Sequence, residues 1–212
     1  MVEILISPRF PAAKLESGSI DDRIDVYEDR LRGWFFGPAR ALLNVPGAGI
    51  AILQLCLGYF EGYWTYRSGE DSKKGRSKEF FRRAFSEIFS HLVIVDPPDL
   101  NLPHDIHETL ANLHYEDGRC GLFHDGMLRG AIYVGSGSAP ISATIEKNTG
   151  RVAGILINPE MFLAEIEFHS DQYMAKLRDP SSADLRNRFN TAWELKNPDA
   201  TGVLHPKALA KN

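Results

Sequence analysis

Most of the chain carries apolar residues at intervals of three or four, which is the spacing of amphipathic helices. Ile20, Ile24, Tyr27 and Leu31 begin this pattern. It recurs along the chain and is interrupted by polar segments or by Gly and Pro. The pattern predicts helices over about 19–36 with a short continuation at 38–43, then 48–67, 77–89, 106–115, 159–177 and 183–195.

Local signals mark where several of these helices begin and end. Ser19 is the predicted N-cap of the first helix, and two acids follow in its first turn. Ser77 and Asp105 are expected to cap the third and fourth helices. Gly37-Pro38 is expected to kink or end the first helix, with Pro38 in the first turn of the continuation.

A short region between the helices has a different character, because it is rich in β-branched residues. The runs 131–134, 141–145 and 152–157 read as strands, and the turn 147–150 between the last two is a hairpin signal. We therefore expect a mainly α protein: a helical bundle with a small antiparallel β-hairpin or three-strand insert. The whole of 1–212 is expected to form one domain. Its bundle covers about 19–128 and 159–195, the β-insert about 131–157, and the tail 197–212 is expected to be loose.

Composition restricts the classes of function. The chain has 212 residues, is 43% hydrophobic and carries a formal charge of −4, so nucleic acid would need a local basic patch. Only two cysteines occur, which favours a reducing cytoplasm over a disulfide framework. The apolar run 50–60 is short and contains Gln54, and the N-terminal residues lack a signal-peptide pattern. We expect no membrane association.

Arg119 and His124 are the most informative pair in the sequence. They lie in the stretch Arg-Cys-Gly-Leu-Phe-His-Asp-Gly, which either ends the helix predicted over 106–115 or opens the next one. An arginine can hold phosphate oxygens through its fork of donors, and an imidazole can transfer protons near neutral pH. Together they are the minimum set for cleaving a phosphodiester without metal. The alternative is structural, with Arg119 capping or salt-bridging a helix end and His124 lying at the surface or the edge of the core.

This stretch resembles the Arg-x(4–6)-His signature of the HEPN superfamily of small helical-bundle proteins. The segment Tyr-Phe-Glu-Gly at 59–62 and the segments around 69–72 and 77–85 are similar to a bacterial group of that general type. The resemblance covers roughly residues 45 to 128. It implies a metal-independent ribonuclease of the toxin or defence type that acts as a homodimer, with a neutralising protein partner. Inactive members that bind nucleotides or serve as partners also exist.

Carried over residue by residue, the resemblance gives Arg119 the role of binding the scissile phosphate and His124 that of transferring protons. It implies neither a metal nor a cofactor. Many catalytic members carry a polar residue directly after the arginine, whereas this chain has Cys120.

Other residues are candidates for a supporting role. Glu61, late in an apolar helix, is expected to orient Arg119 or His124 or else to be a solvated helix end; Asp125 adjoins the motif. A dense basic cluster could follow a phosphate backbone or could be a solvated face. Its members are Lys73, Lys74, Arg76, Lys78, Arg82 and Arg83.

Two further chemistries have weaker support. His104 and His107 have the spacing of a metal-binding pair, with His114 later, but no cluster of Cys or acids completes a ligand set. Cys120 could be a nucleophile beside His124, although no orienting group is evident. Two classes of function therefore remain: a HEPN-like endoribonuclease that acts on RNA, and a non-catalytic helical module that binds a nucleotide or a protein.

Overall fold

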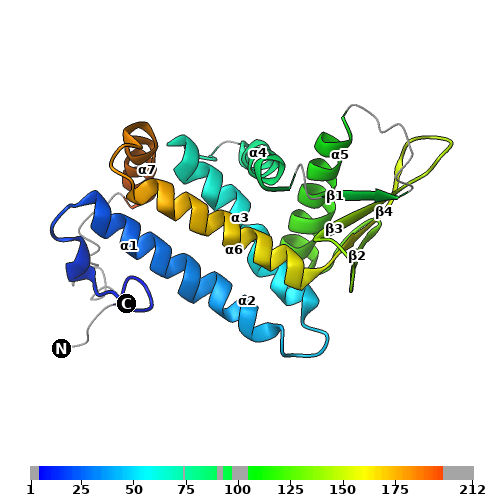
Figure 1. The fold of residues 1–212 in the computed structure, drawn as a ribbon, viewed down its shortest axis with the longest axis horizontal. Coiled ribbons are helices and arrows are strands. Elements are labelled where there is room, and N and C mark those ends of the chain that lie inside the picture. Colours follow the sequence, from blue (N-terminus) through cyan, green and yellow to red (C-terminus); the bar gives the residue numbers. More distant parts are fainter. Residues whose placement is uncertain (1–4, 74, 90–92, 97–104, 198–212) are drawn as a thin grey trace, which may run out of the picture.

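The helices pack around α3, which lies at the centre of the bundle (Figure 1). A computed structural model describes residues 5–73, 75–89, 93–96 and 105–197. The helices are η1 (Ala12–Leu15), α1 (Ile20–Arg30), η2 (Leu31–Phe36), α2 (Gly37–Leu42), α3 (Gly49–Ser68), α4 (Ser77–Phe89), α5 (Ile106–Leu113), η3 (His114–Asp125), α6 (Pro159–Arg178) and α7 (Ala183–Lys196). The mainly α prediction is confirmed.

The central place of α3 follows from its sequence, because this helix is apolar on most of its circumference. Phe60 is fully buried, and its ring lies 4.9 Å from that of Phe81 and 6.0 Å from that of Phe162. These contacts join α3 to α4 and α6. A helix that is apolar all round is stable only when other helices cover it.

The first helix does not end at Gly37-Pro38. The segment η2 is a π-helix, and the chain runs without a break from α1 through η2 into α2. Proline has no N–H to donate within a helix, and a wide turn at this point accommodates it. The predicted continuation after Pro38 is therefore present as α2.

The β-element is larger than the sequence predicted. It has four strands in the order β1-β3-β4-β2: β1 (Val93–Asp96), β2 (Ile132–Val134), β3 (Ile141–Ile145) and β4 (Val152–Ile157). The predicted hairpin is confirmed, since β3 and β4 pair antiparallel. The all-antiparallel arrangement was wrong, because β1 is parallel to β3 and β2 is parallel to β4.

The error has a topological cause. Strand β4 lies between β2 and β3, so these two consecutive strands are not neighbours. Local alternation identifies strands but does not say which strands pair. The sequence reading missed β1, although Val93, Ile94 and Val95 form a short β-branched run that Pro97-Pro98 closes.

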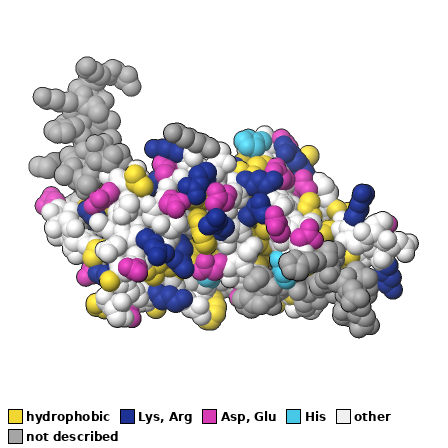
Figure 2. All heavy atoms as spheres, turned by 90° about the horizontal axis from the view of Figure 1, so that it is seen from above, with side chains coloured by type: hydrophobic (Ala, Val, Ile, Leu, Met, Phe, Trp, Pro, Cys, Tyr) yellow, Lys and Arg dark blue, Asp and Glu magenta, His cyan; other side chains and the backbone are white. Residues whose placement is uncertain are grey.

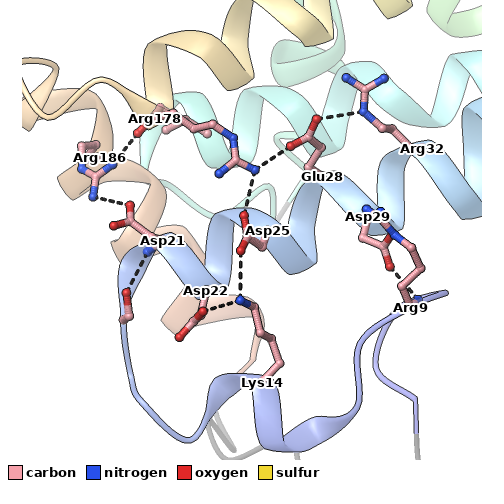
Figure 3. Close-up of polar contacts among 12 residues, drawn as sticks. Arg9, Lys14, Asp21, Asp22, Asp25, Glu28, Asp29, Arg32, Arg178 and Arg186 are labelled. Atoms are coloured by element: carbon pink, nitrogen blue, oxygen red, sulfur yellow. Dashed lines mark hydrogen bonds and ion pairs between the residues drawn. The ribbon is translucent and has the colours of Figure 1, made fainter.

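Ion pairs fasten α1 to the helices around it (Figure 3). Arg178, in α6, lies 2.8 Å from Asp25 and 2.7 Å from Glu28. Lys14, in η1, pairs with Asp25 from the other side at 3.0 Å. The acids of α1 therefore hold helices from both ends of the chain, although partly exposed pairs of this kind contribute little each.

Two further expectations from the sequence concerned the C-terminal tail and the membrane. The tail was expected to be loose, but 198–212 lies outside the described residues. Among the helices that are described, none combines the length and the apolar character needed to cross a bilayer.

Candidate functional site

Arg119 lies in a cavity between α3 and η3. The cavity has a volume of about 420 Å³, and Glu61, Phe123 and Lys196 are among its lining residues. The Arg119 Nη2 atom donates to Glu61 Oε2 at 3.2 Å, and the guanidinium lies 4.7 Å from the centre of the Phe123 ring. The Arg119 side chain is 22% exposed. The Tyr115 ring lies on it as well, with its centre 5.7 Å away. The guanidinium is thus held by one carboxylate and two aromatic rings while it stays accessible to solvent.

Glu61 is itself held in place. Its Oε1 atom accepts a hydrogen bond of 2.8 Å from the hydroxyl of Ser77, the first residue of α4. The carboxylate therefore connects α3, α4 and η3. The structure brings Glu61 to Arg119, as the sequence suggested, and a role for it in chemistry stays a prediction.

His124 follows Arg119 on a π-helix. The sequence could not predict this, because on an α-helix residues five apart point in different directions. In a π-helix the backbone bonds join residue i to i+5, so that His124 lies one turn beyond Arg119. His124 is exposed and is not among the residues that line the Arg119 cavity. The imidazole therefore stands outside the cavity that contains the guanidinium.

Glycines shape the end of this π-helix. A Cβ atom on Gly121 would lie 2.5 Å from the carbonyl oxygen of Met127, so only glycine lets the following segment fold back this closely. Gly126 ends the helix with a φ of +70°, a conformation that glycine adopts without strain. The returning chain is then fixed by a 2.9 Å bond from the Arg129 N–H to the carbonyl oxygen of Asp117.

Asp125 and Cys120 have other partners than His124. Asp125 forms an ion pair with Arg129, and this hydrogen bond lowers the pKa of the carboxyl group. Cys120 is a free, partly buried thiol close to the Tyr115 hydroxyl. Burial, followed by the nearness of Cys120, raises the pKa of Tyr115. No hydrogen bond joins either residue to His124 within the described residues.

The basic cluster is largely balanced by acids. Lys74 lies outside the described residues. The other five members each form an ion pair with a carboxylate: Lys73 with Asp71, Arg76 with Glu70 and Glu79, Lys78 with Glu116, Arg82 with Glu108, and Arg83 with Glu79. Figure 2 shows the same mixing of the two signs over the face that it views. The cluster thus offers much less net positive charge than its sequence suggested.

Of the histidines considered for metal binding, the two that the structure describes differ in burial. His104 lies outside the described residues, His107 is exposed, and His114 is fully buried. Within the described parts of the chain, no group of three or more His, Cys, Asp or Glu side chains is placed to hold a metal ion.

Comparisons of the chain with protein-family models, with curated proteins and with solved structures found no match.

Sequence reasoning missed a second polar cavity, which lies between α3, α4, α6 and α7. Its lining includes Tyr63, His169 and Tyr173. The spacing of His169 and Tyr173, four residues apart on one helix, was a signal that they share a face. Their contact with Tyr63 of α3 depends on how the helices pack, which the sequence pattern does not specify.

Proposed function

We propose that this chain is a HEPN-like, metal-independent endoribonuclease that uses Arg119 and His124. The observation that carries the proposal is the position of Arg119. Its guanidinium lies in a solvent-accessible cavity, is oriented by Glu61, and precedes an exposed histidine by one turn of a π-helix. Both cysteines are free thiols, which is compatible with the cytoplasmic location expected from the sequence.

The chemistry would divide between the two side chains. A guanidinium has five N–H donors, and the contact with Glu61 uses one of them, so others can bind the oxygens of a phosphodiester. The imidazole of His124 would take the proton of the ribose 2′-hydroxyl. The 2′-oxygen would then attack phosphorus, and the bond from phosphorus to the 5′-oxygen would break. The 5′-oxygen must receive a proton as it leaves.

One imidazole cannot act as base and acid in the same step, which favours a homodimer. Exposed apolar side chains lie around the end of η3: Ile50 and Tyr133 share a cavity lining with Met127, which is 67% exposed, and Phe123 lies nearby in sequence. Apolar patches of this kind mark interaction surfaces. A second copy related by a twofold axis at this patch would supply a second His124, so that one imidazole takes the 2′-hydroxyl proton and the other gives a proton to the 5′-oxygen.

A second function, non-catalytic binding of a nucleotide or protein, is favoured by a different observation. Arg119 already has a carboxylate partner, and the described members of the basic cluster are also paired. A surface with so little free positive charge is better suited to a compact ligand than to a long RNA backbone.

RNA cleavage by the purified protein in excess EDTA separates the two. The nuclease proposal expects cleavage in EDTA and a loss of at least about 100-fold in His124→Ala. The control is His107→Ala, which removes another exposed histidine from α5 and should leave cleavage unchanged. If the wild-type protein does not cleave, or His124→Ala cleaves as well as wild type, the nuclease proposal is wrong. Nucleotide binding that Arg119→Ala abolishes would then support the second function.

A further inference from the structure

The cavity between α3, α4, α6 and α7 is separate from the Arg119 site. It has a volume of about 410 Å³, and none of its lining residues lines the Arg119 cavity. This volume lies at the lower end of the range for small-molecule sites, which is about 300–1,000 Å³. The cavity is therefore large enough for a small organic ligand.

Tyr173 supplies the strongest evidence that something binds here. Its side chain lines the cavity and is 3% exposed, and its hydroxyl oxygen is buried with no hydrogen-bond partner among the described residues. Buried polar atoms almost always have a partner, because an unmade hydrogen bond is costly. The neighbouring Tyr63 hydroxyl shows the ordinary case, since it donates to Glu87 Oε1 at 2.8 Å.

His169 offers a second hydrogen-bonding group. Its Nδ1 atom lies 3.0 Å from the Tyr59 hydroxyl, and its ring packs edge-on against Tyr63 with centroids 4.5 Å apart. Burial lowers the pKa of His169 to about 4, so the ring is neutral near pH 7. When Tyr59 donates to Nδ1, the ring proton resides on Nε2, which can then donate to a ligand.

The charges of the lining favour an anion. Three cations, Arg67, Lys176 and Arg188, face two acids in this cavity. Arg67 makes only a long contact of 3.8 Å with Glu87. Within the described part of the chain, neither Lys176 nor Arg188 forms an ion pair. Glu87 already accepts a hydrogen bond from Tyr63. The three cationic side chains of the lining therefore have more N–H donors than the two carboxylates of the lining can accept.

We propose that this cavity binds a small molecule that carries an oxyanion, either a carboxylate or a phosphate monoester. The Tyr173 hydroxyl donates to the oxyanion, Arg188 and Lys176 supply the positive charge, and the aromatic rings of Tyr63 and His169 pack against the rest of the ligand. The site does not depend on the Arg119 and His124 chemistry.

Titration calorimetry with four probes tests the site: acetate, benzoate, inorganic phosphate and phenyl phosphate. We expect benzoate or phenyl phosphate to bind more tightly than acetate or inorganic phosphate, since only the former present a ring. The charged head that binds better identifies the class of ligand. Tyr173→Phe should weaken binding by about tenfold or more, as should Arg188→Gln. Arg151→Gln, which alters an exposed arginine just before β4, is the matched control and should bind like wild type.

The Tm of the ligand-free variant checks that a loss of binding does not come from misfolding. Tyr173→Phe removes an unpaired buried hydroxyl, so its Tm should equal or exceed that of wild type. The proposal is overturned if no probe binds, which would leave water as the occupant. It is also overturned if Tyr173→Phe and Arg188→Gln both bind like wild type. RNA cleavage should be the same in Tyr173→Phe and wild type, so a failure here is distinct from a failure of the nuclease proposal.

Discussion

His114, the first residue of η3, should make the stability of the fold depend on pH. The side chain is fully buried, its Nδ1 atom lies 2.8 Å from the carbonyl oxygen of Leu110, and its Nε2 atom has no partner among the described residues. Burial lowers the pKa of His114 from 6.5 to about 4, against a smaller opposing effect of the hydrogen bond to Leu110. The folded protein therefore holds this ring neutral over a range in which the unfolded chain protonates it.

The sign and size of the effect follow from linkage. Above the unfolded pKa neither state binds a proton here, and the full stability is present. As the pH falls from 6.5 toward 4, only the unfolded state gains the proton, so the free energy of unfolding falls. Each pKa unit corresponds to about 1.4 kcal/mol, which gives a loss of about 2 kcal/mol between about pH 7.5 and pH 5.

Urea unfolding of wild type and His114→Leu, followed by circular dichroism across this pH range, isolates the effect. His169, which also has a lowered pKa, is present in both proteins and cancels in the difference. Leucine keeps the site apolar, and the Leu110 carbonyl retains its backbone partner. We expect His114→Leu to gain about 2 kcal/mol relative to wild type on acidification. The reasoning would be refuted if the free energy of unfolding changed with pH almost equally in the two proteins, with a difference of less than about 0.5 kcal/mol between pH 7.5 and pH 5.

Three further predictions concern stability, each measured by chemical denaturation with a matched control. Asp29→Ala should cost about 2–4 kcal/mol, because buried Asp29 accepts from the Ser7 hydroxyl at 2.7 Å and the Arg9 N–H at 2.8 Å. Exposed Asp171→Ala should cost under about 0.5 kcal/mol, and equal losses would contradict the burial argument. Gly121→Ala should cost about 1–3 kcal/mol by crowding the Met127 carbonyl, whereas Gly62→Ala, whose Cβ would meet nothing within 4 Å, should be neutral or stabilising. Glu61→Gln should cost about 1 kcal/mol, and Glu116→Gln, in a more exposed pair with Lys78, should cost less; the reverse order would be inconsistent with the geometry of the Arg119 site.

Much of the helical structure could be predicted because its signals are local. Ser19 accepts from the Asp21 N–H at 3.1 Å, which makes it the N-cap that the sequence indicated. Pro159 opens α6, and the Asn158 side chain caps it.

The other two expected caps were wrong: the Asp105 side chain makes no capping hydrogen bond, and Ser77 is the first residue of α4, with its hydroxyl donating to Glu61. A capping residue type is a local signal, but a distant partner can take its side chain.

The sheet depended on contacts between distant segments. Residues 132–134 and 152–157 read correctly as strands, but their parallel pairing and the addition of β1 required the packed structure. Strand order is set by which faces become buried against the bundle, and an isolated run of β-branched residues carries no information about its neighbours.

By itself the sequence indicated that the stretch with Arg119 and His124 either ends one helix or opens the next, and that Glu61 is an acid at the end of a very apolar run. Only the tertiary structure decided that η3 winds as a π-helix, that Glu61 crosses to Arg119, and that α3, α4, α6 and α7 enclose Tyr173 and His169. The physical reason is the range of the interactions. Helix periodicity and caps act over a few residues, whereas ion pairs and cavities join residues that are brought together only when the core is packed.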